Sequence, residues 1–127
     1  MTFIKWEEKN KLGHTEIDNQ HESIHTSINT LYEIQNEKKE IIVKEFELLI
    51  NKFVEHFETE DQFMKKHNVP SLFSHTLEHE RALGKYTSYL EEYKINKDPF
   101  DVEIVQSLKT WIHNHAEMKD SKFRKYL

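Results

Sequence analysis

Apolar residues recur at intervals of three and four along four stretches of the chain. This spacing places them on one face of an α-helix, because an α-helix has 3.6 residues per turn. Asp18 is expected to cap the first helix, and Pro70 to end the second segment and enter the first turn of the third. The pattern predicts helices over about residues 18–35 and 39–66, and apolar stripes over residues 72–93 and 104–115.

The connections between these stretches are short, which favours an all-α fold with neighbouring helices antiparallel. We therefore expect an up-down-up-down four-helix bundle. The first dozen residues, which include Trp6, are expected to form an N-terminal arm that packs on the bundle. The whole chain, residues 1–127, is interpreted as one domain.

Composition excludes several classes of function. The chain has no cysteine and only two glycines, which rules out disulfides, thiolate metal sites and glycine-rich phosphate loops. A net charge of -5 with interleaved signs argues against a nucleic-acid partner. No apolar run approaches the roughly 20 residues that span a bilayer, and no signal-peptide core is seen at the start. We expect no membrane association and a cytoplasmic location.

Histidine is the residue type that changes this picture. The chain has nine histidines, and each predicted helix carries at least one on its apolar stripe. A four-residue step puts His56 and Glu60 on one face, and His75 and His79 on another. Up-down alternation then brings one set of side chains to the same end of the bundle: His21, His56, Glu60, His75, His79 and His115.

A metal explains this set better than ordinary packing does. One histidine on an apolar face is usually a hydrogen-bonded core residue, but five would each need a partner, at about 1–3 kcal/mol per unsatisfied group. Imidazole and carboxylate ligands suit zinc, iron, copper or nickel. A structural zinc takes four ligands, and this set offers more, so two metals are the better interpretation. A ferritin-like site would need two Glu-x-x-His motifs, and the chain has one, Glu22 to His25.

The segment "WIHNHAEMKD" poses a geometric problem. His115 follows the apolar stripe into the bundle, whereas His113 lies roughly 200° away and is expected to face solvent. Asp120 lies about 140° from the His115 direction in a regular helix. If both His115 and Asp120 reach one site, the helix must end, widen into a π-type turn or unwind between Ala116 and Lys119.

The four segments "GHTEIDNQH", "HFETEDQFM", "HTLEH" and "WIHNHAEMKD" resemble the signature blocks of the hemerythrins, particularly the single-domain bacteriohemerythrins. The resemblance implies reversible dioxygen binding, for storage, delivery, scavenging or sensing, at two oxo- or hydroxo-bridged iron ions per chain. It assigns one iron to His75, His79 and His115, and the other to His21 and His56. Glu60 and Asp120 would bridge the two.

The remaining predictions concern the surroundings of that site. Dioxygen, the expected partner, would bind the iron of His21 and His56, in an apolar pocket lined by Ile24, Phe57, Trp111 and Ile112. Most of these side chains would pack in the core in any case. His25 is either a rival ligand or an outer hydrogen-bond partner. We expect His14, His67, Glu58 and Asp61 to be solvent-exposed.

We expect a binding protein rather than an enzyme, and a monomer, with an oligomer left open. One alternative is a di-iron enzyme that reduces oxygen, peroxide or nitric oxide, since the ligands do not exclude turnover. Another is a metal-free helical interaction module, in which the histidine-rich faces would be incidental.

Overall fold

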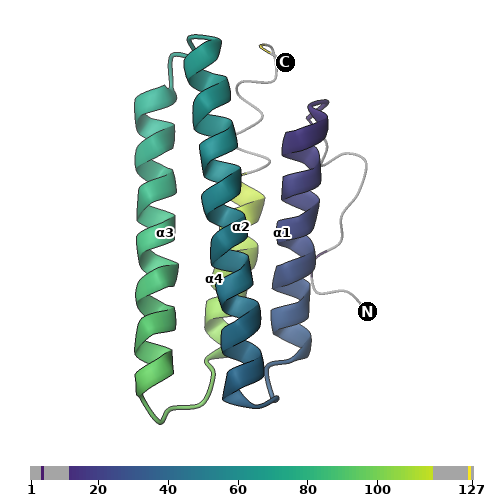
Figure 1. Ribbon diagram of the computed structural model, residues 1–127, viewed down its shortest axis with the longest axis vertical. Coiled ribbons are helices and arrows are strands. Elements are labelled where there is room, and N and C mark those ends of the chain that lie inside the picture. Colours follow the sequence, from purple (N-terminus) through teal and green to yellow (C-terminus); the bar gives the residue numbers. More distant parts are fainter. Residues whose placement is uncertain (1–3, 5–11, 116–125, 127) are drawn as a thin grey trace.

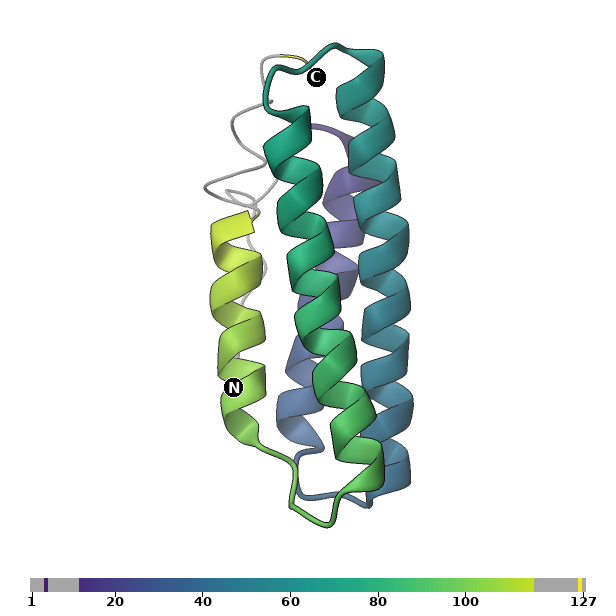
Figure 2. The same cartoon turned by 90° about the vertical axis from the view of Figure 1, so that its left-hand side faces the viewer.

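The computed structural model describes residue 4, residues 12–115 and residue 126, and all element bounds below refer to these. Four antiparallel helices form an up-down-up-down bundle (Figures 1 and 2). None of the described residues forms a strand. The predicted fold class is therefore confirmed. The helices are α1 (Thr15–Glu33), α2 (Lys39–Lys66), α3 (Leu72–Ile95) and α4 (Val102–His113).

The start of α1 differs from the prediction. His14, not Asp18, is the N-cap, and its Nδ1 accepts a hydrogen bond from the backbone N–H of Ile17 at 3.2 Å. Asp18 lies inside the first turn and is buried, where its carboxylate accepts from the backbone N–H groups of Leu12 (2.7 Å) and Gly13 (3.1 Å). The acidic side chain therefore binds the incoming chain instead of the helix end, and α1 begins earlier than predicted.

The bounds predicted for α2 are confirmed, and the turn that follows it contains Asn68 with φ 53°. Pro70 lies before the N-cap of α3, Ser71, rather than in the first turn of that helix.

Ile4 packs on the main core, and the side chain of Asn29 on α1 bonds both the backbone N–H and the carbonyl of Ile4. Trp6 and the rest of the predicted arm lie outside the described residues.

Two apolar clusters enclose a polar layer near one end of the bundle. The main core includes Ile24 and Phe53, and the smaller cluster includes Ile17 and Met64. Along α1, His21 lies between Ile17 and Ile24. Along α2, His56 and Glu60 lie between Phe53 and Met64. Any polar side chain in this layer is cut off from water on both sides and needs a partner there. No described helix is long and apolar enough to cross a membrane.

Candidate metal centre

The polar layer contains six of the seven side chains predicted to bind metal. Each is no more than 4% exposed, and they come from α1, α2, α3 and the residues just after α4. Their donor atoms form two groups, each with all atoms within 4.8 Å of one another. The groups share Glu60 and His115. One consists of His21, His56, Glu60 and His115, and the other of Glu60, His75, His79 and His115.

Glu60 lies at the middle of both groups and is fully buried. Its Oε1 lies 2.7 Å from Nε2 of His115, 2.8 Å from Nε2 of His56 and 3.4 Å from Nε2 of His79. One carboxylate oxygen thus faces imidazole nitrogens from three segments of the chain. A carboxylate in this position can bridge two cations held by the rings on either side.

Two of the rings are oriented by partners that were not predicted. Nδ1 of His56 lies 2.9 Å from Oε1 of Gln20, and Nδ1 of His79 lies 3.0 Å from Oδ1 of Asp61. In both rings Nδ1 points outward and Nε2 points toward Glu60. Histidines that bind metals are commonly oriented by such a bond from the other ring nitrogen.

The prediction that Asp61 is simply solvent-exposed is wrong. Its side chain is only 30% exposed, and it also accepts a hydrogen bond from Thr76 Oγ1 at 3.3 Å. Glu58 is exposed, as predicted. Gln20 and Asp61 each adjoin a buried ligand candidate in sequence, and they lie on the flank of their helix that faces the next one. A polar residue next to a candidate ligand, on the side of the helix that faces another helix, was the signal that the sequence offered for these outer partners.

The two oriented rings have opposite pKa shifts. Burial lowers the pKa of His56 to about 4, aided by the nearby His21 and His115 and only partly offset by Glu60. Burial also lowers the pKa of His79, but its hydrogen bonds to Asp61 and Glu60 outweigh this, so the pKa is raised. His56 is therefore neutral at pH 7, which is the form that binds metal ions.

The end of α4 separates the two histidines of "WIHNHAEMKD". His115 is 2% exposed and points into the layer, whereas His113 is exposed, as predicted. The chain changes from α-helical to π-helical geometry at Asn114 and His115. Residues 116–119, where the prediction placed a break, and Asp120 lie outside the described residues.

No protein-family model matches the chain. It is 28% identical over 126 residues to a bacteriohemerythrin of Clostridium acetobutylicum, covering 93% of this chain and 96% of the relative. A bacteriohemerythrin of Stenotrophomonas maltophilia is 24% identical over 124 residues, covering 97% of this chain and 80% of the relative. Both relatives match the part of the chain that carries the buried histidine and carboxylate donors. Over nearly its whole length the chain is similar to bacteriohemerythrins.

Solved structures agree at the level of the fold. A wild-type hemerythrin crystal structure superposes with a TM-score of 0.91 at 20% identity, covering 98% of each chain. The crystal structure of a hemerythrin point mutant gives a TM-score of 0.93 at 21% identity, covering 100% of this chain and 98% of that one. The four-helix arrangement is therefore the hemerythrin fold over the length of the chain.

Aromatic rings cover two histidines of the site. Phe57 stacks on His79 with ring centroids 4.1 Å apart and an interplanar angle of 4°. Trp111 stacks on His115 at 4.6 Å and 12°. Ile24 and Ile112 are at most 1% exposed and belong to the main core. The four residues predicted to line a dioxygen pocket thus all lie in or against the apolar core beside the site.

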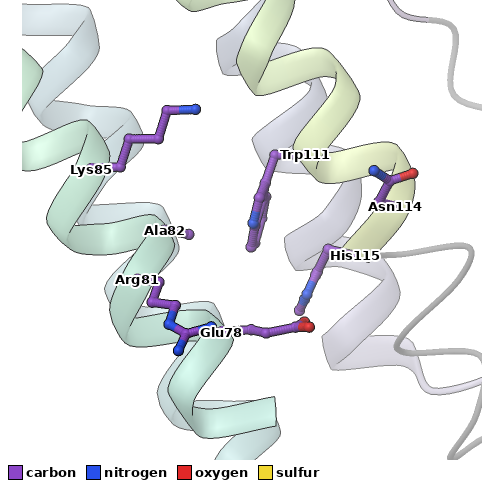
Figure 3. Close-up of a pocket in the computed structure, with 7 residues that line it drawn as sticks. All are labelled: Glu78, Arg81, Ala82, Lys85, Trp111, Asn114 and His115. Atoms are coloured by element: carbon purple, nitrogen blue, oxygen red, sulfur yellow. The ribbon is translucent and has the colours of Figure 1, made fainter. Parts of the chain in front are cut away.

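A hollow of about 310 Å³ opens beside this wall, between α3 and α4 (Figure 3). Trp111 and His115 line it from the α4 side, opposite Ala82 on α3. Arg81 and Lys85 are exposed at its rim. The indole of Trp111 thus borders this hollow, and its ring centroid lies 5.5 Å from that of Phe57.

The remaining histidines have different surroundings. His25, one turn beyond His21, is 6% exposed, and its pKa is lowered to about 4 by burial and by the neighbouring His21 and His113. It belongs to neither of the two donor groups found among the described residues. His67 is exposed, as predicted, whereas His14 is partly buried because it caps α1.

Proposed function

We propose that this protein binds dioxygen reversibly at a non-haem di-iron centre. The observation that carries the proposal is the pair of buried donor groups that share Glu60. Imidazole and carboxylate donors without thiolate fit iron. Relatives named bacteriohemerythrin match nearly the whole chain, and they favour iron over the other metals that this donor set would accept.

The ligand assignment follows the family resemblance. His75, His79 and His115 would hold one iron, and His21 and His56 the other. Glu60 would bridge them, with Asp120 as the second carboxylate bridge and an oxo or hydroxo group between the irons. The division of the donors into two groups around Glu60 supports this assignment. His115 lies in both groups, and the resemblance places it with His75 and His79.

When bound, the metal pair supplies the electrons and the coordination position for dioxygen. The protein's own residues prepare that position. Gln20 orients His56, and Glu60 faces three ring nitrogens without contact with solvent. Ile24, Phe57, Trp111 and Ile112 would form the apolar pocket that keeps water from the site. Exclusion of water limits proton entry and side reactions, which supports binding rather than turnover.

The proposal also includes a single di-iron domain over residues 1–127, a monomeric state and a cytoplasmic location. Light scattering of the iron-loaded protein tests the monomer, and a mass twice that of the chain would contradict it. Steady consumption of oxygen, peroxide or nitric oxide with a reductant present would contradict the non-enzymatic role.

Iron analysis combined with a spectral titration tests the central proposal. The purified protein should contain about two irons per chain. Anaerobically reduced protein should change its visible absorption on exposure to air, and removal of oxygen should reverse the change. Colourless protein without stoichiometric iron would refute the proposal.

A further inference from the structure

The outer partners of the two oriented histidines differ in charge. His56 donates from Nδ1 to the neutral amide oxygen of Gln20 at 2.9 Å, whereas His79 donates to the carboxylate of Asp61 at 3.0 Å. His56 belongs to one donor group and His79 to the other. The two groups thus differ in the charge of these two outer partners, an amide in one and a carboxylate in the other.

The hydrogen bonds around Gln20 determine which nitrogen of His56 carries the proton. Thr59 Oγ1 donates to the carbonyl of Glu55 at 3.0 Å and therefore accepts from Gln20 Nε2 at 2.9 Å. The amide nitrogen of Gln20 is thus directed at Thr59 and its oxygen at His56. Because that oxygen can only accept, Nδ1 of His56 must carry the proton.

The same conclusion holds for His79, since an ionised carboxylate can only accept. Thr76 also donates to Asp61 Oδ1, at 3.3 Å, and so helps to hold the carboxylate against the ring. In the neutral form of each ring, which is the form that binds a metal, Nε2 is then unprotonated and faces the interior next to Glu60. The two rings share a tautomer and differ in the charge of the acceptor.

We propose that Asp61 and Gln20 make the two halves of the centre electronically unequal. A hydrogen bond to a carboxylate is stronger than one to an amide, and it draws the Nδ1 proton away from the ring. The His79 ring is then the more electron-rich donor, so the metal it holds favours the ferric state more than the metal held by His56. Asp61 acts as a positioning and tuning residue through His79. This inference rests on the proposed di-iron function.

Glu58 provides a matched control for charge alone. It lies on α2 and lines the same surface hollow as Asp61 and His79, it is exposed, and it bonds Gln62 at 3.4 Å instead of a histidine. Glu58→Gln therefore removes the same charge from the same region without altering the bond to His79. Solvent screens an exposed charge, so its loss should matter little.

The experiment compares Asp61→Asn, Asp61→Ala, Gln20→Glu and Glu58→Gln in iron-loaded protein by spectroelectrochemistry. Asp61→Asn keeps an acceptor but loses the charge, and should raise the reduction potential of one iron. A tenfold lower preference for ferric over ferrous iron corresponds to about 59 mV for a one-electron couple. Gln20→Glu should shift the potential of the other iron downward. Glu58→Gln should leave both unchanged.

Two further readouts do not depend on the oxygen reaction. Imidazole proton–nitrogen NMR of the metal-free protein should show a hydrogen-bonded proton on Nδ1 of His79 in the wild type and in Asp61→Asn, and its loss in Asp61→Ala. Binding of Zn²⁺ should weaken by about 10- to 100-fold in Asp61→Ala, as is usual for loss of an outer partner. A thermal melt of each variant confirms that it is folded.

The outcomes separate this inference from the proposed function. A wild-type protein that takes up no iron refutes the function and the inference together. If the wild type loads iron but Asp61→Asn shifts the potentials no more than Glu58→Gln does, only the inference fails. A potential that changes only in Asp61→Ala would show that Asp61 positions the ring without tuning it, and would overturn the electronic inequality.

Discussion

The Nε2 atoms of His56 and His115 lie 3.4 Å apart, and both face Oε1 of Glu60. The two histidines are 59 positions apart in the sequence. One comes from the C-terminal half of α2 and the other from the π-helical residues after α4. Their approach brings three ring nitrogens and one buried carboxylate oxygen together, and the first prediction concerns that oxygen.

Replacement of Glu60 by glutamine should lower the metal stoichiometry from about two per chain to one or fewer. The amide is nearly the same size, but it is neutral and a weak bridge between two cations. Metal analysis after loading with excess iron measures the effect. Glu55→Gln, on the exposed side of the same helix, is the control. Full stoichiometry in Glu60→Gln would contradict the bridging role.

His113 and His115 form a matched pair two residues apart. His115→Ala should weaken metal binding by more than the about 10- to 100-fold typical of an outer partner, because it removes a donor shared by both groups. His113→Ala should leave the affinity for the metal within about twofold of the wild-type value, since that side chain is exposed. Metal competition titrations compare the two. Equal losses in both variants would indicate that the end of the helix matters more than either ring.

The metal-free protein should lose stability in acid in part through His25. Its pKa is lowered from 6.5 to about 4 in the folded state, so as pH falls below 6.5 the unfolded chain takes up a proton that the folded chain resists. The free energy of unfolding therefore falls between pH 6.5 and 4.

His25→Leu tests this pH dependence. Denaturant titrations at several pH values should show that the free energy of unfolding falls less in the variant, by roughly 3 kcal/mol over that range. The comparison uses the slope with pH, so a constant change in stability from the substitution does not affect it. Parallel pH profiles for wild type and variant would contradict a buried, neutral His25.

Trp111 should protect the site as well as stabilise the bundle. Trp111→Ala removes a ring that stacks on His115 beside the hollow between α3 and α4. We expect the free energy of unfolding to fall by about 3 kcal/mol. This is near the lower end for buried aromatic residues, because one side of the ring already faces the hollow. Iron-loaded protein should also oxidise irreversibly faster in air.

Trp111→Phe keeps an aromatic ring and serves as the control for that substitution. It should retain most of the stability and most of the resistance to oxidation. Denaturant melts and the rate of spectral change in air measure both properties. An unchanged oxidation rate in Trp111→Ala, with the expected loss of stability, would show that the ring has only a packing role.

Most of the fold was predictable from local spacing. The step of three and four residues on α2 gave both of its bounds correctly, because a long amphipathic helix is specified by its own periodicity. The start of α1 was not predictable in the same way. His14 caps it and Asp18 bonds the preceding chain. Both contacts depend on the path that residues 12–14 take into the helix.

The sequence alone determined which faces carry histidine, and the antiparallel order determined that those faces meet at one end. It therefore identified His21, His56, Glu60, His75, His79 and His115 as a converging set, and it separated His115 from His113 by direction alone. Asp120 remains a prediction, because it lies outside the described residues.

Only the tertiary structure decided which atoms face each other. Gln20 and Asp61 contact histidines 36 and 18 positions away, and no local pattern encodes a contact between two helices. Helical periodicity reports which side of a helix is buried, but the axial register between packed helices sets hydrogen-bond partners. That register depends on the shapes of all the side chains in the core, and it gave His56 a neutral partner and His79 a charged one.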